Sequence, residues 1–273
     1  AKLNRHFVEA LNNKLSNLSL SITEGFGDYQ PNLHYLRKFP LINSIYLNSK
    51  IKSNDIEVIS RNLYPPRVKD LDARVNLLHS YGWEESSFPS EWVDEFNTYL
   101  QGITVMSCQV KKILIDNGVY IPIKVSGLGL DHIDRVIPDS DFKLHAKKYK
   151  ILHISSCFPR KGVDILLQAF CDTFTDKDDV SLIIKTFQNP HNDIENRLEE
   201  IRNNNSNVPE IIILNNDMTD EQIKSLLIQS NMLVAPSKGE GFGLPIGEAM
   251  RLGIPVITTG WGGQLDFCTN QNS

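Results

Sequence analysis

The sequence lacks the patterns that mark membrane, disulfide-stabilised and nucleic-acid-binding proteins. Its four cysteines are scattered without a C-x-x-C pair, which argues against a zinc site or a disulfide framework and favours a reducing cytoplasm. We expect each cysteine to lie in or beside a buried strand or helix. No apolar run reaches the roughly 20 residues that a membrane-spanning helix needs. The net charge is −5, so the chain lacks the positive field on which DNA- and RNA-binding proteins rely.

The second half of the chain alternates short apolar runs with amphipathic stretches. Because continuous apolar strands separated by amphipathic helices are typical of a parallel sheet covered on both faces, this half predicts a doubly wound, Rossmann-like domain. The predicted strands are Ile151–Ile154, Val180–Thr186, Ile211–Leu214, Met232–Ala235 and Pro255–Thr258. The predicted helices are Val163–Phe174, Asp193–Asn203, Asp220–Gln229 and Pro245–Leu252.

The first half follows a similar but less regular pattern. The predicted strands are Leu18–Ile22, Ile56–Ser60, Val75–His79, Ile103–Ser107 and Ile123–Ser126, and the predicted helices are Lys2–Leu15, Ser90–Tyr99 and Gln109–Asn117. Polar, aperiodic residues 138–149 form the predicted linker between domains of residues 1–137 and 150–273. Two α/β domains in tandem place the expected ligand site in the cleft between them.

The segment PSKGEGFGLPIGEAM, residues 236–250, is the most informative part of the chain. It follows a predicted strand and opens a predicted helix, so it belongs at the carboxyl edge of the sheet, where ligands of this architecture bind. Gly239, Gly241 and Gly243 allow a ligand to approach the backbone closely. Pro245 suits the first helical turn, whose unpaired N–H groups would face an anion such as a diphosphate.

Two carboxylates, Glu240 and Glu248, bracket this loop with seven residues between them. Both can accept hydrogen bonds from the hydroxyls of a sugar or a ribose. The glycine pattern differs from the dinucleotide fingerprint, because Ile246 stands where G-x-G-x-x-G requires its last glycine. The alternative is an ordinary glycine-rich turn with a solvated helix start.

A second cluster, SSCFPRKG, lies between the first strand and the first helix of the second domain. Lys161 precedes Gly162 at the helix entrance, where a cation can neutralise a diphosphate leaving group. Arg160 can add a bidentate contact, or it can line only the rim of the site. The alternative for both residues is a solvated pair that caps a loop.

These two segments resemble the E-x7-E and R-x4-K-G signatures of retaining GT-B glycosyltransferases of family 4 (group 1). The resemblance implies that Glu240 contacts the donor sugar and Glu248 the nucleotide ribose. It also implies that the backbone of Phe242, Gly243 and Leu244 holds the sugar and diphosphate. The chain departs from the family pattern at two positions, since Ser156 occupies the usual arginine position and Leu128 replaces the asparagine of the N-G-V-D turn.

Three further candidates carry weaker signals. Lys185 ends an apolar strand and either reaches the cleft or extends to the surface. Asn216 follows the next strand, in a loop where this family contacts the nucleotide base through backbone groups. His79 ends a strand of the first domain and precedes Tyr81, Trp83 and Glu84, a mixture suited to a sugar acceptor. We count His79 with Glu240 and Lys161 as candidate catalytic groups, the alternative being a structural histidine. Gly25 and Gly27 are expected to border the cleft.

The resemblance implies an α/β fold of the GT-B type, with two Rossmann-like domains facing a cleft. It also implies that an N-terminal strand with its glycine-rich loop and the C-terminal crossover helices lie outside this chain. The implied activity is transfer of a hexose-type sugar from a GDP- or UDP-linked donor to a glycan or lipid-linked acceptor, with no metal and no cofactor. We expect a cytoplasmic protein, alone or in peripheral contact with the cytoplasmic face of a membrane. The alternatives are a non-catalytic sugar-nucleotide-binding homologue and, more remotely, a nicotinamide-dependent oxidoreductase.

Overall fold

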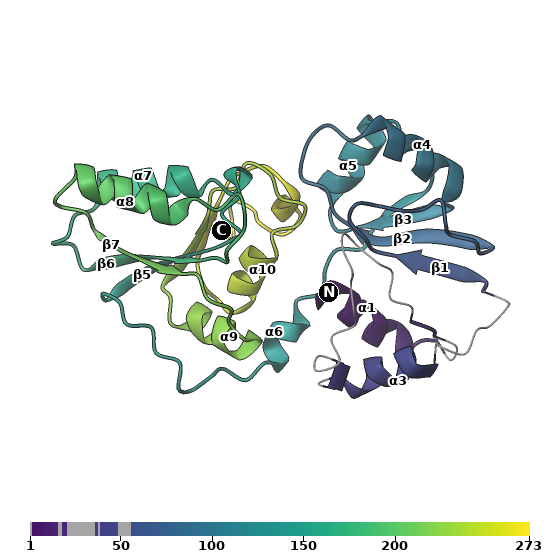
Figure 1. The fold of residues 1–273 in the computed structure, drawn as a ribbon, viewed down its shortest axis with the longest axis horizontal. Helices are drawn as coiled ribbons and strands as arrows, with labels where there is room; N and C mark the ends of the chain where they lie inside the picture. Colours follow the sequence, from purple (N-terminus) through teal and green to yellow (C-terminus); the bar gives the residue numbers. More distant parts are fainter. Residues whose placement is uncertain (1, 16–17, 21–35, 38, 49–55) are drawn as a thin grey trace. The chain divides into compact units, whose positions relative to one another are not determined.

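The computed structural model describes residues 2–15, 18–20, 36–37, 39–48 and 56–273 (Figure 1). The chain divides into two compact units, and each is described by itself. The first unit comprises Ala1–Tyr81, Phe88–Thr104 and Leu114–Lys124, and the second comprises Gly82–Ser87, Val105–Ile113 and Val125–Ser273. Among the described residues, no helix is long and apolar enough to cross a lipid bilayer.

The first unit is built on a four-stranded sheet in the order β1-β2-β3-β4. Its strands are β1 (Val58–Arg61), β2 (Val75–Tyr81), β3 (Gly102–Val105) and β4 (Ile123–Val125), and its helices include α1 (Lys2–Asn12), α3 (Pro40–Asn48) and α4 (Ser90–Tyr99). Strands β1 and β2 are parallel, with Val58 opposite Val75. The rings of Phe96 in α4 and Tyr81 at the end of β2 meet in a T-shaped contact, with centroids 5.5 Å apart, so α4 packs against this sheet.

The second unit is a five-stranded parallel sheet in the order β7-β6-β5-β8-β9. Its strands are β5 (Tyr149–Ile154), β6 (Val180–Lys185), β7 (Glu210–Leu214), β8 (Met232–Ala235) and β9 (Val256–Thr258). Its helices include α6 (Asp131–Arg135), α7 (Val163–Thr173), α8 (Ile194–Asn204), α9 (Asp220–Ile228) and α10 (Leu244–Arg251). Helices α7 and α8 cover one face of the sheet, and α9 and α10 cover the other (Figure 1).

The strand order determines where this unit can hold a ligand. The chain moves from β5 outward through β6 and β7, and then returns to place β8 on the other side of β5. The loops that follow β5 and β8 therefore leave the same edge of the sheet in opposite directions. A crevice at such a switch point is the usual ligand site of a doubly wound sheet.

The predicted α/β class with parallel sheets is confirmed, and each of the strands and helices predicted for the second half is present within a few residues. Helices α3 and α6 were not predicted, because neither short segment shows a full amphipathic repeat. Of the strand predicted at Leu18–Ile22, residues 18–20 are not in a strand, and the rest lies outside the described residues, as do Gly25 and Gly27. All four cysteines are free thiols: Cys157 and Cys268 are buried, Cys171 is partly buried, and Cys108, the first residue of helix α5 (Cys108–Asp116), is exposed.

Candidate active site

Two loops of the second unit lie in direct contact at the switch point, and a glycine makes the contact possible. Gly162 ends the loop after β5 with a φ of +67°, in the left-handed region that glycine adopts without strain. A Cβ atom at this position would lie 2.2 Å from the carbonyl oxygen of Pro236, in the loop after β8. The backbone N–H of Lys238 donates to the carbonyl oxygen of Arg160 at 2.7 Å, which joins the two loops further.

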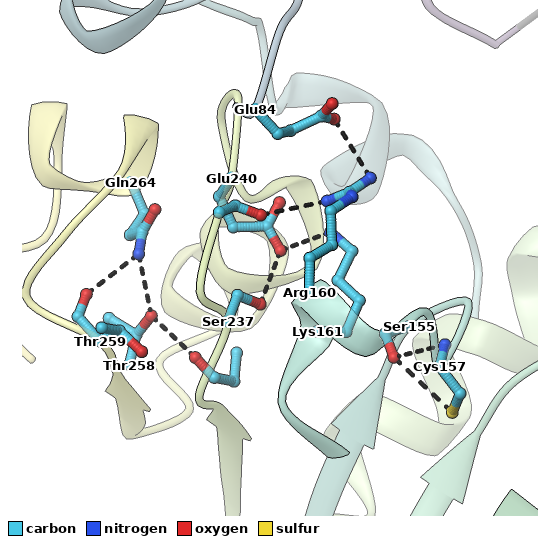
Figure 2. Close-up of polar contacts among 12 residues, drawn as sticks. Glu84, Ser155, Cys157, Arg160, Lys161, Ser237, Glu240, Thr258, Thr259 and Gln264 are labelled. Carbon is cyan, nitrogen blue, oxygen red and sulfur yellow. Dashed lines mark hydrogen bonds and ion pairs between the residues drawn. The ribbon is translucent and has the colours of Figure 1, made fainter. Parts of the chain in front are cut away.

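The centre of the site is an ion pair between these loops. The ammonium of Lys161 lies 2.6 Å from Oε1 of Glu240, and the hydroxyl of Ser237 donates to the same oxygen at 2.8 Å (Figure 2). The two charged side chains are only 13% and 12% exposed. Two of the three candidate catalytic groups therefore occupy one largely buried cluster.

Arg160 lies beside this pair but has partners of its own. Its guanidinium donates to the carbonyl oxygen of Gly239 at 3.1 Å and to Oε1 of Glu84 at 3.3 Å (Figure 2). A Cβ atom on Gly239 would lie 2.8 Å from the backbone oxygen of Glu84, so the loop needs a glycine here. Arg160 thus ties the loop after β8 to the segment Gly82–Ser87.

The start of α10 adjoins Glu240. Gly243, with a φ of +85°, is the residue before the helix, and Leu244 and Pro245 open it. Phe242 is buried against Phe267, with ring centroids 5.0 Å apart, which fixes the entry of the chain into the helix. The first N–H groups of a helix have no partner within it and carry a partial positive charge. The loop that holds Glu240 therefore ends at the unpaired N–H groups of a helix start.

Glu248, the second glutamate of the E-x7-E pattern, is held in a different pair. Its Oε1 lies 2.6 Å from Nε2 of His132 in α6, and both side chains are buried. Glu240 and Glu248 thus belong to one loop–helix segment, but each carboxylate has its own basic partner.

Lys185 and Asn216 meet at the ends of β6 and β7. The ammonium of Lys185 donates to the carbonyl oxygens of Thr186 and Asn216 at 2.5 and 2.9 Å. Its side chain is buried, which lowers the pKa of its ammonium and contradicts the alternative in which it extends to the surface. The side chain of Asn216 is exposed, so Lys185 fastens the backbone of this loop and leaves the amide at the surface.

His79, the third candidate catalytic group, belongs to the first unit. Its ring stacks on Phe7 with a centroid distance of 3.9 Å, and its Nδ1 lies 2.9 Å from the hydroxyl of Ser60. Its Nε2 is buried and has no hydrogen-bond partner among the described residues. Burial lowers the pKa of His79 to about 4, so its imidazole is neutral near pH 7.

The second half of the chain matches a known protein family. Residues 137–273, half of the chain, match the family of glycosyl transferases group 1. The chain belongs to this family. The matched residues contain Lys161, Ser237, Glu240 and Glu248, so the predicted group 1 resemblance is confirmed; the assignments to family 4 and to a retaining mechanism stay predictions.

Relatives of this group 1 chain include two mannosyltransferases. The MMP alpha-(1->4)-mannosyltransferase of Mycolicibacterium hassiacum is 31% identical over 111 residues, covering 40% of this chain and 26% of that protein. The serotype-specific mannosyltransferase WbdA of Escherichia coli is 33% identical over 99 residues, covering 36% of this chain and 12% of that protein. The chain thus spans about a quarter or less of the length of each of these two relatives.

Solved structures share the fold of this group 1 chain. Anabaena HepE, in complex with UDP and glucose, has a TM-score of 0.58 and 21% identity, covering 72% of this chain and 56% of that one. A glycosyltransferase from Rickettsia africae has a TM-score of 0.61 and 19% identity, covering 96% and 71%. Likeness at such identities shows the fold, and it confirms the predicted GT-B type.

Three polar residues of the candidate site were not predicted from the sequence. Ser237 and His132 contact the two glutamates directly. Gln264 is fully buried, and its Nε2 donates to the carbonyl oxygen of Thr259 at 3.0 Å (Figure 2). It also donates to the carbonyl oxygen of Trp261 at 2.7 Å, and together these bonds hold the loop after β9. A serine three residues before Glu240 was visible in the sequence as a local partner, whereas nothing in the sequence connects His132 with Glu248.

Proposed function

We propose that this protein transfers a hexose-type sugar from a GDP- or UDP-linked donor to an acceptor hydroxyl, with retention of anomeric configuration and without a metal ion. Two relatives are mannosyltransferases, and HepE binds UDP and glucose; both findings support a sugar-nucleotide donor. We further propose a family 4 enzyme of glycan or polysaccharide synthesis. It would act in the cytoplasm on a glycan or lipid-linked acceptor, alone or at the cytoplasmic face of a membrane.

The observation that carries this proposal is the cluster of Lys161, Glu240 and Ser237 beside the first turn of α10. Glycosyl transfer releases a nucleoside diphosphate, and the negative charge that develops on its leaving oxygen is the main electrostatic demand of the reaction. An ammonium has three N–H donors, and the bond to Glu240 uses one of them. Lys161 can therefore donate its remaining hydrogen bonds to a diphosphate.

Glu240 supplies the complementary function at the sugar. Its carboxylate accepts a hydrogen bond from a sugar hydroxyl, with Ser237 and Lys161 fixing its orientation. In the proposed step the bond between the anomeric carbon and the diphosphate oxygen breaks, and the acceptor oxygen bonds to that carbon on the same face. The acceptor proton moves to the departing diphosphate. No protein nucleophile is needed in this step.

Binding and turnover on the same protein test the proposal. A thermal-shift screen with UDP, GDP, UDP-glucose and GDP-mannose identifies the nucleotide, and release of the nucleoside diphosphate from the matching donor measures turnover. We expect Lys161→Ala and Glu240→Gln to remain folded and to lose about 100-fold or more in turnover, since each removes a group that stabilises developing charge or orients the sugar.

Lys238→Ala is the matched control, because Lys238 lies in the same loop with its side chain 51% exposed. We expect this variant to retain wild-type turnover. Wild-type turnover in both Lys161→Ala and Glu240→Gln would contradict the assignment of the site. A donor that binds tightly and is neither transferred nor hydrolysed would support the non-catalytic alternative instead.

A further inference from the structure

Strands β5 and β8 part at the switch point, and a buried histidine lies where they part. The backbone pairing between these two strands ends one residue before His153 in β5 and Val234 in β8. His153 is only 1% exposed, and its Nδ1 lies 2.8 Å from the carbonyl oxygen of Val234. The imidazole therefore links the two strands whose following loops carry Lys161 and Glu240.

The two ring nitrogens of His153 have opposite roles. A carbonyl oxygen only accepts hydrogen bonds, so Nδ1 carries the proton in the contact with Val234. Burial lowers the pKa of His153, so the imidazole is neutral near pH 7 and its Nε2 is an acceptor. This nitrogen lies 2.8 Å from Oγ of Ser155, and the hydroxyl therefore donates to it. Sγ of Cys157 is a more distant acceptor for the same hydroxyl, at 3.8 Å.

The oxygen of Ser155 holds a strained turn in the loop after β5. Because its proton points to His153, its lone pairs accept the backbone N–H of Cys157 at 3.0 Å (Figure 2). Cys157 has a φ of +54°, in the left-handed region that strains a non-glycine residue and persists only where surrounding contacts hold it. Ser155 thus keeps the loop in a conformation that the chain would not adopt freely.

This turn leads directly to Lys161. A 3-10 helix, Pro159–Lys161, begins two residues after Cys157, and within it the N–H of Lys161 donates to the carbonyl oxygen of Phe158 at 2.7 Å. The backbone direction that is set at Cys157 therefore determines where this short helix and the ammonium of Lys161 lie. A loss of the turn would move the ammonium relative to Glu240.

We infer that His153 and Ser155 are positioning residues that hold the loop after β5 so that the ammonium of Lys161 reaches the diphosphate of the bound donor. This inference rests on the proposed function. The hydrogen bonds form one directional chain, from the N–H of Cys157 through Ser155 and His153 to the carbonyl oxygen of Val234. Its essential member is the acceptor nitrogen of His153, and its effect on the reaction passes through Lys161.

The direction of this chain can be measured without a ligand. In ¹⁵N NMR of histidine-labelled protein near neutral pH, the two neutral tautomers and the charged ring give distinct signals, and loss of one signal in His153→Gln assigns His153. We expect the tautomer with its proton on Nδ1. A proton on Nε2 alone, or a charged ring, would overturn the inference and leave the proposed function untouched.

Two substitutions separate the two bonds of His153. The amide of His153→Asn lies near the position of Nδ1 and keeps the bond to Val234, whereas the amide of His153→Gln reaches the position of Nε2 and keeps an acceptor for Ser155. Calorimetry with UDP or GDP, whichever binds, measures the contact of Lys161 with the diphosphate. We expect Ser155→Ala and His153→Asn to bind about ten-fold more weakly than the wild type, as for a lost hydrogen bond between charged groups. His153→Gln should stay within about three-fold of the wild type, because the turn is kept.

The same measurement in a Lys161→Ala background tests whether the effect passes through Lys161. We expect Ser155→Ala to weaken binding there by less than about two-fold, because residues that act through one another have non-additive effects. Ser230→Ala is the matched control. Ser230 is a buried serine just before β8, at the opposite edge of the same sheet, so this variant should bind like the wild type. If His153→Asn does not fold, Ser155→Ala, which removes a single oxygen, carries the comparison.

Three binding results would contradict the inference. They are wild-type affinity in Ser155→Ala, an equal loss with and without Lys161, which indicates structural support alone, and a greater loss in His153→Gln than in His153→Asn. The last result would assign the role to the bond with Val234 instead. Failure of the wild type to bind any nucleoside diphosphate is a separate result, because it contradicts the proposed function while the tautomer of His153 still reports on the chain of hydrogen bonds.

Discussion

The imidazole of His79 should resist protonation until the pH falls to about 4, and the protein should lose stability below pH 6.5 for that reason. His79 is 7% exposed, and its ring lies flat on Phe7. Burial is the cause of the lowered pKa, since a charged imidazole in this position would lose its hydration.

The sign and size of the effect follow from proton linkage. Between pH 6.5 and about 4 the unfolded chain protonates His79 while the folded chain does not, so acid favours unfolding. The stability contributed by neutral His79 is fully present above pH 6.5 and falls progressively through this window. Lowering the pH from 7.5 to 5.0 should remove about 2 kcal/mol of the free energy of unfolding.

Urea unfolding of the wild type and of His79→Gln at several pH values measures this contribution. Glutamine does not titrate, so any packing loss in the variant is the same at every pH, and only the pH-dependent difference between the two proteins counts. His145→Gln serves as the exposed control. Parallel stability curves for wild type and His79→Gln, or an NMR titration midpoint of His79 near 6.5, would refute the reasoning.

A neutral His79 could accept a hydrogen bond but could not supply positive charge near pH 7.

The remaining predictions concern backbone contacts and buried amines and amides. Gly162→Ala should destabilise the protein by about 2 kcal/mol more than Gly253→Ala in thermal unfolding, since both glycines have positive φ but only the first would clash, with Pro236; equal effects would contradict this. Gln264→Leu should cost about 2 kcal/mol in urea unfolding through its lost hydrogen bonds; an unchanged midpoint would show that the loop after β9 does not depend on this amide. Lys185→Met should cost about 1–3 kcal/mol, because two carbonyl oxygens lose their donor; a gain in stability would show that burying the ammonium costs more than its bonds return.

The periodicity of the second half was sufficient to predict its architecture. Strands such as Val180–Lys185 are buried at every position, and helices such as α7 bury one face, so the pattern of apolar residues follows directly from the layers. The contact between the loops after β5 and β8 was predictable for a related reason. Both loops follow strands on either side of the switch point, and glycines mark where the backbone must approach closely.

The pairing of Glu248 could not be predicted in the same way. His132 lies 116 residues away in a five-residue helix, too short to show a hydrophobic repeat. Its position depends on the packing of Leu130 against Gly247, and side-chain packing between distant segments leaves no periodic signal. The sequence indicated that Glu248 faces a polar partner, and the structure shows that this partner includes a residue of the protein.

The three cations near the sheet edge show which partners a sequence can reveal. A buried charge requires compensation wherever it lies, but the compensating group can be a carboxylate or a backbone carbonyl. Lys161 is paired with Glu240, the one carboxylate of the glycine-rich loop, so their association was predictable. Lys185 donates to carbonyl oxygens, with Asp217 adding a favourable charge nearby. Every residue carries a carbonyl, so these hydrogen-bond partners leave no signal in the sequence that distinguishes burial of Lys185 from exposure. Arg160 combines both kinds of partner, which is why its role stayed open until the position of Glu84 was known.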